Sequence, residues 1–208
     1  MAILYVSRAE YKDRLGITDD DHDFMVDRVL DGASRWVEQV CGRRFYTTAS
    51  DETRYYTAEW YWQVDVPDDV LSITSLTTDA NGDGTYETTW TEGTDFYLAP
   101  INAVADGVPF TSIMRKFPSG RFSFPSYINA VRIVGRFGYC QIEDVPAGVR
   151  NLTMMAADLD GGVNDLVVPG VASYKLGNEL TVTMGGRNVP SSSKALIDQF
   201  RRGNRYIA

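Results

Sequence analysis

Residues 20–44 of this 208-residue chain read DDHDFMVDRVLDGASRWVEQVCGRR. Apolar side chains recur there at intervals of one, three and four residues, the spacing of one face of an α-helix. They are Val26, Val29, Leu30, Ala33, Val37 and Val40. Acidic residues crowd the start, where they complement the helix dipole, and Gly42 is a stop signal. The pattern predicts an amphipathic helix over about residues 20–41, capped by Thr18 or Asp19.

Two further helices are predicted from their end signals. Ser7 and Glu10 have the spacing of a capping box, and Gly16 ends the short helix that they open. Pro146 suits the first turn of a later helix with apolar residues at helical spacing, which stops at Gly161.

The C-terminal part of the chain predicts one more helix. Residues 191–193 are serines that can cap it, and Gly203 stops it. Ahead of this helix, residues 163–173 have the composition of a loop, and residues 175–184 predict either one further strand or an extended arm.

The pattern changes between Arg44 and Tyr139, where apolar residues alternate with polar ones in short runs rich in Thr, Tyr and Val. Glycine, proline and aspartate turns separate these runs, as in antiparallel strands. The fold class is therefore α+β: a helical frame with an inserted antiparallel β domain. We place the frame at residues 1–45 and 146–208, and the β-rich domain at residues 46–145.

Composition limits the chemistry that this chain can perform. Its 20 basic and 28 acidic residues give a net charge of −8, which argues against wrapping nucleic acid with the whole surface. The one histidine, His22, disfavours most zinc sites and the Ser-His-Asp and Cys-His schemes. Cys41 and Cys140, without an export signal, are expected to be reduced and packed as small apolar groups. We expect no cofactor and no enzymatic activity.

The segment from Asp79 to Gly84 matches the first half of a calcium loop. Asp79, Asn81 and Asp83 could offer oxygen ligands at alternate positions. The twelfth position is Trp90 instead of a glutamate, and the flanks predict strands. A hairpin turn is the favoured interpretation, because Asn-Gly and Asp-Gly suit positive φ angles.

Aromatic residues are densest at Tyr55, Tyr56, Trp60, Tyr61 and Trp62. They predict a mixture of β-domain core and protein interface, and a sugar-stacking platform is the alternative. On a strand, Trp60 and Trp62 would share one face and Tyr61 would point to the other.

The C-terminal segment differs in charge from the rest of the chain. Residues 191–208 carry a net charge of +3, which leaves −11 for residues 1–190. The basic residues are Lys194, Arg201, Arg202 and Arg205. Such a tail is expected to dock on an acidic partner, including a neighbouring copy of the chain.

The order of these features resembles the head–tail connector (adaptor) proteins of long-tailed double-stranded DNA bacteriophages. A short helix, an acidic turn and a long helix come first, then an inserted β region and two more helices. The matching stretches are Val40-Cys41-Gly42-Arg43-Arg44-Phe45, Gly93–Leu98, Val131–Tyr139, Val145-Pro146, Lys175–Thr183 and Arg201-Arg202. The long β insertion departs from the smallest family members, which are mostly helical.

The resemblance implies a structural virion protein that forms a ring, usually of twelve subunits, at the neck beneath the capsid portal. Such a ring joins the portal to the tail or the next neck protein, and genomic DNA passes through its lumen without sequence-specific binding. It would assemble in the host cytoplasm, with no membrane partner. On this basis we expect Arg201, Arg202, Arg205 and Tyr206 to bind the portal.

Contacts between subunits are expected at the acidic helix start, Asp19, Asp20, Asp21 and Asp23, and at Trp60 and Trp62 of the β domain. Other functions stay open. They are a carbohydrate-binding or glycan-degrading module built on the aromatic cluster, another phage neck or tail protein such as a stopper or tail terminator, and a non-viral β-rich scaffold.

Overall fold

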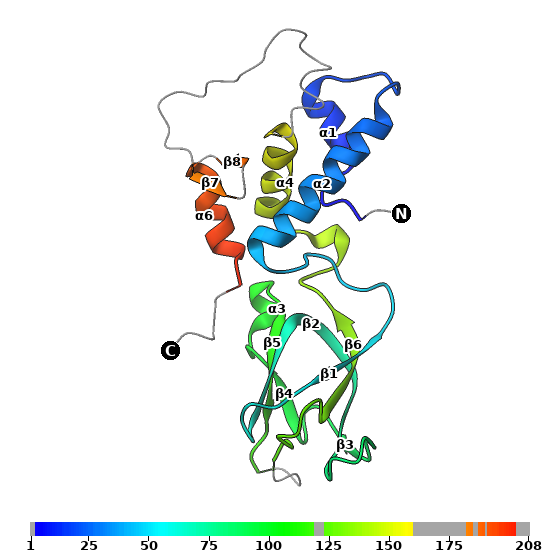
Figure 1. The fold of residues 1–208 in the computed structure, drawn as a ribbon, viewed down its shortest axis with the longest axis vertical. Coiled ribbons are helices and arrows are strands. Elements are labelled where there is room, and N and C mark those ends of the chain that lie inside the picture. The colour runs from blue at the N-terminus through cyan, green and yellow to red at the C-terminus, as the bar shows by residue number, and fades with distance from the viewer. Residues whose placement is uncertain (1–2, 119–122, 160–181, 185–186, 190, 203–208) are drawn as a thin grey trace. The chain divides into compact units, whose positions relative to one another are not determined.

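The computed structural model describes residues 3–118, 123–159, 182–184, 187–189 and 191–202 (Figure 1). The chain divides into two compact units, one formed by residues 1–43 with 145–208 and the other by residues 44–144. The first unit is mainly helical and the second contains a six-stranded antiparallel sheet, so the predicted α+β class is confirmed. In the described part of the chain, no helix has the length and apolar character needed to span a membrane.

Helices form the first unit. They are α1 (Arg8–Leu15), α2 (Asp23–Cys41), α4 (Ala147–Leu159) and α6 (Ser191–Phe200), and the short strands β7 (Val182–Met184) and β8 (Arg187–Val189) pair antiparallel. α4 packs against both α2 and α6. The predicted stripe of α2 is buried except at Val40, which is partly exposed. Val26, Leu30 and Ala33 contribute to a core with Tyr11 of α1 and Ala156 of α4. The apolar periodicity of the sequence thus marks the faces that meet.

The ends of the first two helices differ in part from the prediction. α2 begins at Asp23, three residues later than expected, and its cap residue His22 makes no side-chain capping bond, so the predicted cap at Thr18 or Asp19 is wrong. In α1, Ser7 Oγ accepts the Glu10 N–H at 3.2 Å, as a capping serine does. The Glu10 carboxylate instead pairs with Arg150 of α4 at 2.5 Å, which joins α1 to α4.

The second unit is built around the long strand β2 (Gln63–Thr78). The other strands are β1 (Glu52–Tyr56), β3 (Thr88–Trp90), β4 (Phe96–Ala99), β5 (Phe110–Arg115) and β6 (Val131–Phe137). The strand order is β1-β6-β2-β5-β4, with β3 also paired to β2. The first part of β2 pairs with β5 and the second with β6, and the register shifts between Asp65 and Val70. This irregularity lets one strand serve both halves of the sheet.

Side chains of β6 alternate between buried and partly exposed, as the sequence predicted for this strand. Its inward residues Val131, Ile133 and Phe137 join a core that includes Leu76 of β2 and Ile113 of β5. Two short helical segments complete the unit: α3 (Ala103–Asp106), between β4 and β5, and the 3-10 helix η1 (Ile142–Asp144). No pattern in the sequence predicted α3.

Candidate functional site

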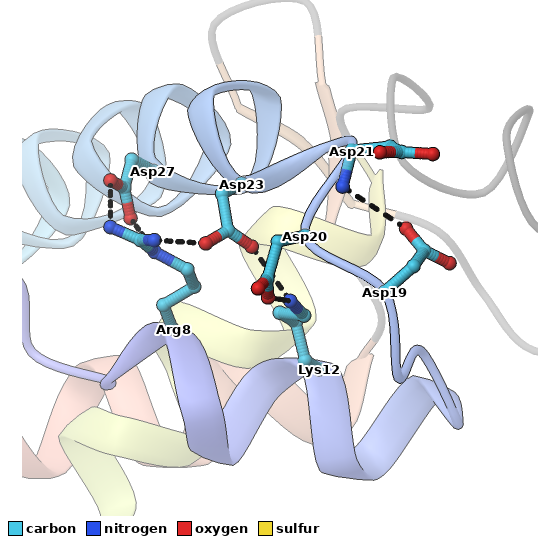
Figure 2. A network of polar contacts seen from close by, with 7 residues as sticks. All are labelled: Arg8, Lys12, Asp19, Asp20, Asp21, Asp23 and Asp27. Carbon is cyan, nitrogen blue, oxygen red and sulfur yellow. Dashed lines mark hydrogen bonds and ion pairs between the residues drawn. The ribbon is translucent and has the colours of Figure 1, made fainter.

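Ion pairs join the start of α2 to α1 (Figure 2). Lys12 Nζ lies 2.7 Å from Asp23 Oδ1 and 3.0 Å from Asp20 Oδ1. The Arg8 guanidinium makes two hydrogen bonds to the Asp27 carboxylate, at 2.9 and 2.7 Å, and also pairs with Asp23. Asp23 therefore bridges Arg8 and Lys12 of α1, and this network fixes α1 along the first turns of α2.

These contacts move the pKa values of the bridging groups. Hydrogen bonds from Lys12 and then from Arg8 hold the pKa of Asp23 below its usual value, although burial opposes the shift. The Asp23 and Asp20 carboxylates raise the pKa of Lys12. Both shifts favour the charged forms of Lys12 and Asp23, so this ion pair is kept through the neutral range.

Of the acidic residues predicted to contact another subunit, Asp20 and Asp23 thus have partners within the chain. Asp19 and Asp21 are exposed and precede the helix. Figure 2 shows their carboxylates directed away from Arg8 and Lys12. Asp19 Oδ1 accepts the Asp21 N–H at 3.3 Å, which shapes the turn into α2.

Basic residues of the predicted C-terminal arm lie at the other end of α2. The Arg202 N–H donates to the Cys41 carbonyl oxygen at 3.0 Å, which places the end of α6 beside the end of α2. Arg201 and Lys194 are exposed. Arg205 and Tyr206 lie outside the described residues.

The aromatic cluster is mostly at the surface of the second unit. Tyr56 is buried, whereas Trp60, Tyr61 and Trp62 are 55%, 63% and 37% exposed. The predicted strand faces are wrong, because these three residues precede β2 in a turn closed by the Gln63 N–H and the Trp60 carbonyl. In this turn the Trp60 and Trp62 rings stack, with their centroids 6.3 Å apart.

A second segment with an exposed aromatic residue begins beside this turn. The Arg115 N–H donates to the Trp62 carbonyl at 2.9 Å, so the end of β5 lies beside the turn. Phe117, two residues after Arg115, is 81% exposed. The Arg115 guanidinium carbon lies over the Phe117 ring, 5.7 Å from the centroid of the ring. Phe117 was not predicted from the sequence, because only the pairing of β2 with β5 places the end of its strand beside the turn. We call Trp60, Tyr61, Trp62 and Phe117 the aromatic edge.

The predicted calcium loop is the hairpin loop between β2 and β3, so the hairpin interpretation is confirmed. The Asp79 carboxylate accepts backbone N–H groups of Asn81, Gly82 and Gly84. Burial acts to raise the pKa of Asp79, but these hydrogen bonds outweigh it and the pKa lies below its usual value. Carboxylate oxygens of Asp79, Asp83 and Glu87 lie within 4.8 Å of one another.

Asn81, the third predicted ligand, turns its side-chain amide to the Asp83 carboxylate, with Nδ2 donating at 3.1 Å. Glu87 Oε1 accepts the Ala80 N–H at 3.2 Å. Together with the contacts of Asp79, these hydrogen bonds within the β2–β3 loop account for its shape.

The two thiols have the character expected from the sequence. Burial raises the pKa of Cys41 to about 11 and that of Cys140 to about 12. The Cys140 Sγ lies 3.1 Å from the Phe45 carbonyl oxygen, as a weak donor would. Both stay protonated at neutral pH, which is the unreactive form.

No protein-family model and no curated protein match this chain. Solved structures do. A chain from the neck of an empty gene transfer agent particle, computed with C6 symmetry, is 15% identical and has a TM-score of 0.55. The match covers 97% of this chain and 92% of that one. A chain from the neck of the native particle, computed with C12 symmetry, is 16% identical, with a TM-score of 0.51 and coverage of 93% and 86%.

A chain from the virion of the native gene transfer agent is also similar, at 16% identity and a TM-score of 0.52. It matches over 95% of this chain and 89% of that chain. At such identities the likeness is one of fold, and it extends over both units of the chain.

Proposed function

We propose that this chain is a structural protein of the neck of a phage-like particle, where identical copies form a ring. The fold similarity to neck chains carries the proposal, because it spans nearly the whole of both chains rather than one unit. The similar chains come from necks computed with C6 and C12 symmetry, which supports a closed ring of identical subunits.

In this ring the chain joins the capsid portal to the tail or to the next neck protein, and DNA passes through the lumen. The net charge of −8 supports passage without adhesion, because binding to DNA needs cations that neutralise phosphates. A head-to-tail ring also needs two different faces on each subunit. The two ends of α2 supply such a difference in the first unit, with Asp19 and Asp21 at one end and Arg201 near the other.

We assign the portal contact to Arg201, Arg202, Arg205 and Tyr206. The exposure of Arg201 at the end of α6 supports this assignment, since an exposed guanidinium can pair with carboxylates of a partner. Contacts between ring neighbours are assigned to the acidic start of α2 and to Trp60 and Trp62. The exposure of these two rings supports a role in protein contact, because exposed aromatic groups are enriched at interfaces.

The experiment is a mass measurement by light scattering, with and without a purified portal protein, followed by electron microscopy of the assembled species. The proposal predicts closed rings, either for the chain alone or on the portal. A chain that remains a monomer at high concentration, with and without portal, would exclude the neck function.

The exposed, stacked Trp60 and Trp62 rings also favour a second candidate, a carbohydrate-binding module, because flat aromatic faces can stack on sugars. That function predicts that oligosaccharides quench the tryptophan fluorescence. A neck protein that uses these rings for protein contacts predicts no such quenching.

A further inference from the structure

A second exposed apolar surface of the β unit surrounds α3. Ile101, Val104 and Val108 are 71%, 82% and 37% exposed, and they lie within eight residues of one another. Soluble proteins rarely expose apolar groups in such a cluster unless a partner covers them. We call these three residues the aliphatic turn.

The aliphatic turn and the aromatic edge lie at opposite ends of the same pair of strands. β4 and β5 are antiparallel, and α3 connects them at the end where Ala99 faces Ser112. The aromatic edge adjoins the other end, since Arg115 of β5 contacts the Trp62 backbone. The six residues of β5 separate the two surfaces by about 20 Å, at roughly 3.3 Å per residue.

Charge distinguishes the two surfaces. Asp106 is the only charged residue between Phe96 and Met114, so the aliphatic turn carries one negative charge. Arg115 and Lys116 follow directly at the other end of β5, beside the aromatic edge. Asp106 and Lys116 are both exposed. Glu59, exposed beside Trp60, adds one negative charge to the two positive charges of Arg115 and Lys116 at the aromatic edge. The two surfaces therefore differ in their apolar side chains, and only the aromatic edge adjoins cations.

We infer that the aliphatic turn of one copy packs on the aromatic edge of a second copy, with Asp106 facing Lys116. This inference rests on the proposed ring, because a ring repeats a contact between two different faces of the same chain. Burial of aliphatic groups against aromatic rings supplies the affinity, and opposite charges set the register of the contact.

Charge reversal tests the pairing directly. Asp106→Lys and Lys116→Glu each place like charges in the contact. Each variant is expected to raise the protein concentration at which half of the chains are assembled into rings by at least tenfold. The double variant restores the pair and is expected to assemble within about threefold of the wild type. Glu143→Lys, a reversal at an exposed position of η1, is the control and should assemble like the wild type.

Cysteine cross-linking gives a second readout. Val104→Cys with Phe117→Cys should give a ladder of covalent multimers under mild oxidation, and each single variant should give at most dimers. Rings that form normally in all charge variants, without a ladder, would overturn the contact and leave the neck function standing. A wild-type chain that never assembles would instead overturn the neck function itself.

Discussion

Asp23 links α2 to two cations of α1. It accepts from Lys12 and pairs with Arg8, and it stands at the first position of α2, where the helix dipole favours a carboxylate. We expect Asp23→Asn to lower the melting temperature by a few degrees at pH 7, because Lys12 loses its nearest charged partner. Thermal melts followed by circular dichroism measure this.

The pH dependence of that change identifies its cause. A carboxyl group whose pKa is lowered in the folded state stabilises the fold above its unfolded pKa of about 3.9, and the contribution disappears as the pH falls through the folded pKa. The difference between wild type and Asp23→Asn should thus be constant above about pH 5 and vanish in strong acid. Asp21→Asn, with the same charge change at an exposed position, is the control. Equal destabilisation by both variants would contradict this account.

At the scale of elements, Gly148 of α4 sets how closely α6 can approach. A Cβ atom at this position would lie 2.6 Å from Cε2 of the buried Phe200 ring and 3.4 Å from Leu196 Cδ2. Overpacking of this kind costs about 1–3 kcal/mol, more than the roughly 0.8 kcal/mol gained when leucine replaces glycine in a helix. We expect Gly148→Leu to loosen α6, which faster hydrogen exchange of the α6 amides would show.

Gly32→Leu is the matched control, because Gly32 is exposed in the middle of α2 and only the helix preference applies there. It should leave exchange in α6 unchanged. A Gly148→Leu, Phe200→Ala double variant should recover part of the lost protection by making room for the new side chain. Unchanged exchange in the single variant would show that the α4–α6 contact tolerates a larger residue.

The ends of α1 and α2 were predictable from the glycines that follow them, Gly16 and Gly42, and α2 was predictable also from the apolar stripe that it buries. The start of α2 was not, because several residues from Thr18 to Asp23 can cap a helix, whereas the cap position belongs to His22, which makes no side-chain capping bond. The order of the strands in the sheet could not be predicted either, because it depends on contacts between distant parts of the chain. β2 pairs with β6 across more than fifty residues, and the sequence holds no local signal for that choice.

The exposed surfaces were likewise predictable where local sequence marks them and not where strand pairing forms them. The exposed cluster at Trp60 and Trp62 was visible in the sequence, although its turn conformation was not. Phe117 and the aliphatic turn became candidates only when the strand pairing placed them relative to the tryptophans. Local composition therefore marks residues suited to contact, and long-range pairing decides which of them share a surface.

At the scale of the whole molecule, we expect the basic C-terminal segment to contribute to portal binding without being needed for folding. Deletion of residues 203–208 removes Arg205 and Tyr206 from the proposed portal contact. The cut follows the end of α6 and the bond between the Arg202 N–H and the Cys41 carbonyl, so both elements keep their described contacts. The truncated chain should melt within about two degrees of the wild type, since it keeps every helix and core residue that the structure describes.

Portal binding should fall at least tenfold in the same variant, because one guanidinium and one aromatic group leave the contact. A full-length Arg205→Ala, Tyr206→Ala variant separates the loss of these two side chains from the loss of chain length, and it should bind as weakly as the deletion. Biolayer interferometry against immobilised portal gives both affinities, and salt titration tests the charge contribution, which should weaken as ionic strength rises. If the truncated chain binds the portal as tightly as the wild type, the portal contact lies on another face of the subunit. If the truncated chain still forms rings, the neck assignment is supported whatever its portal affinity.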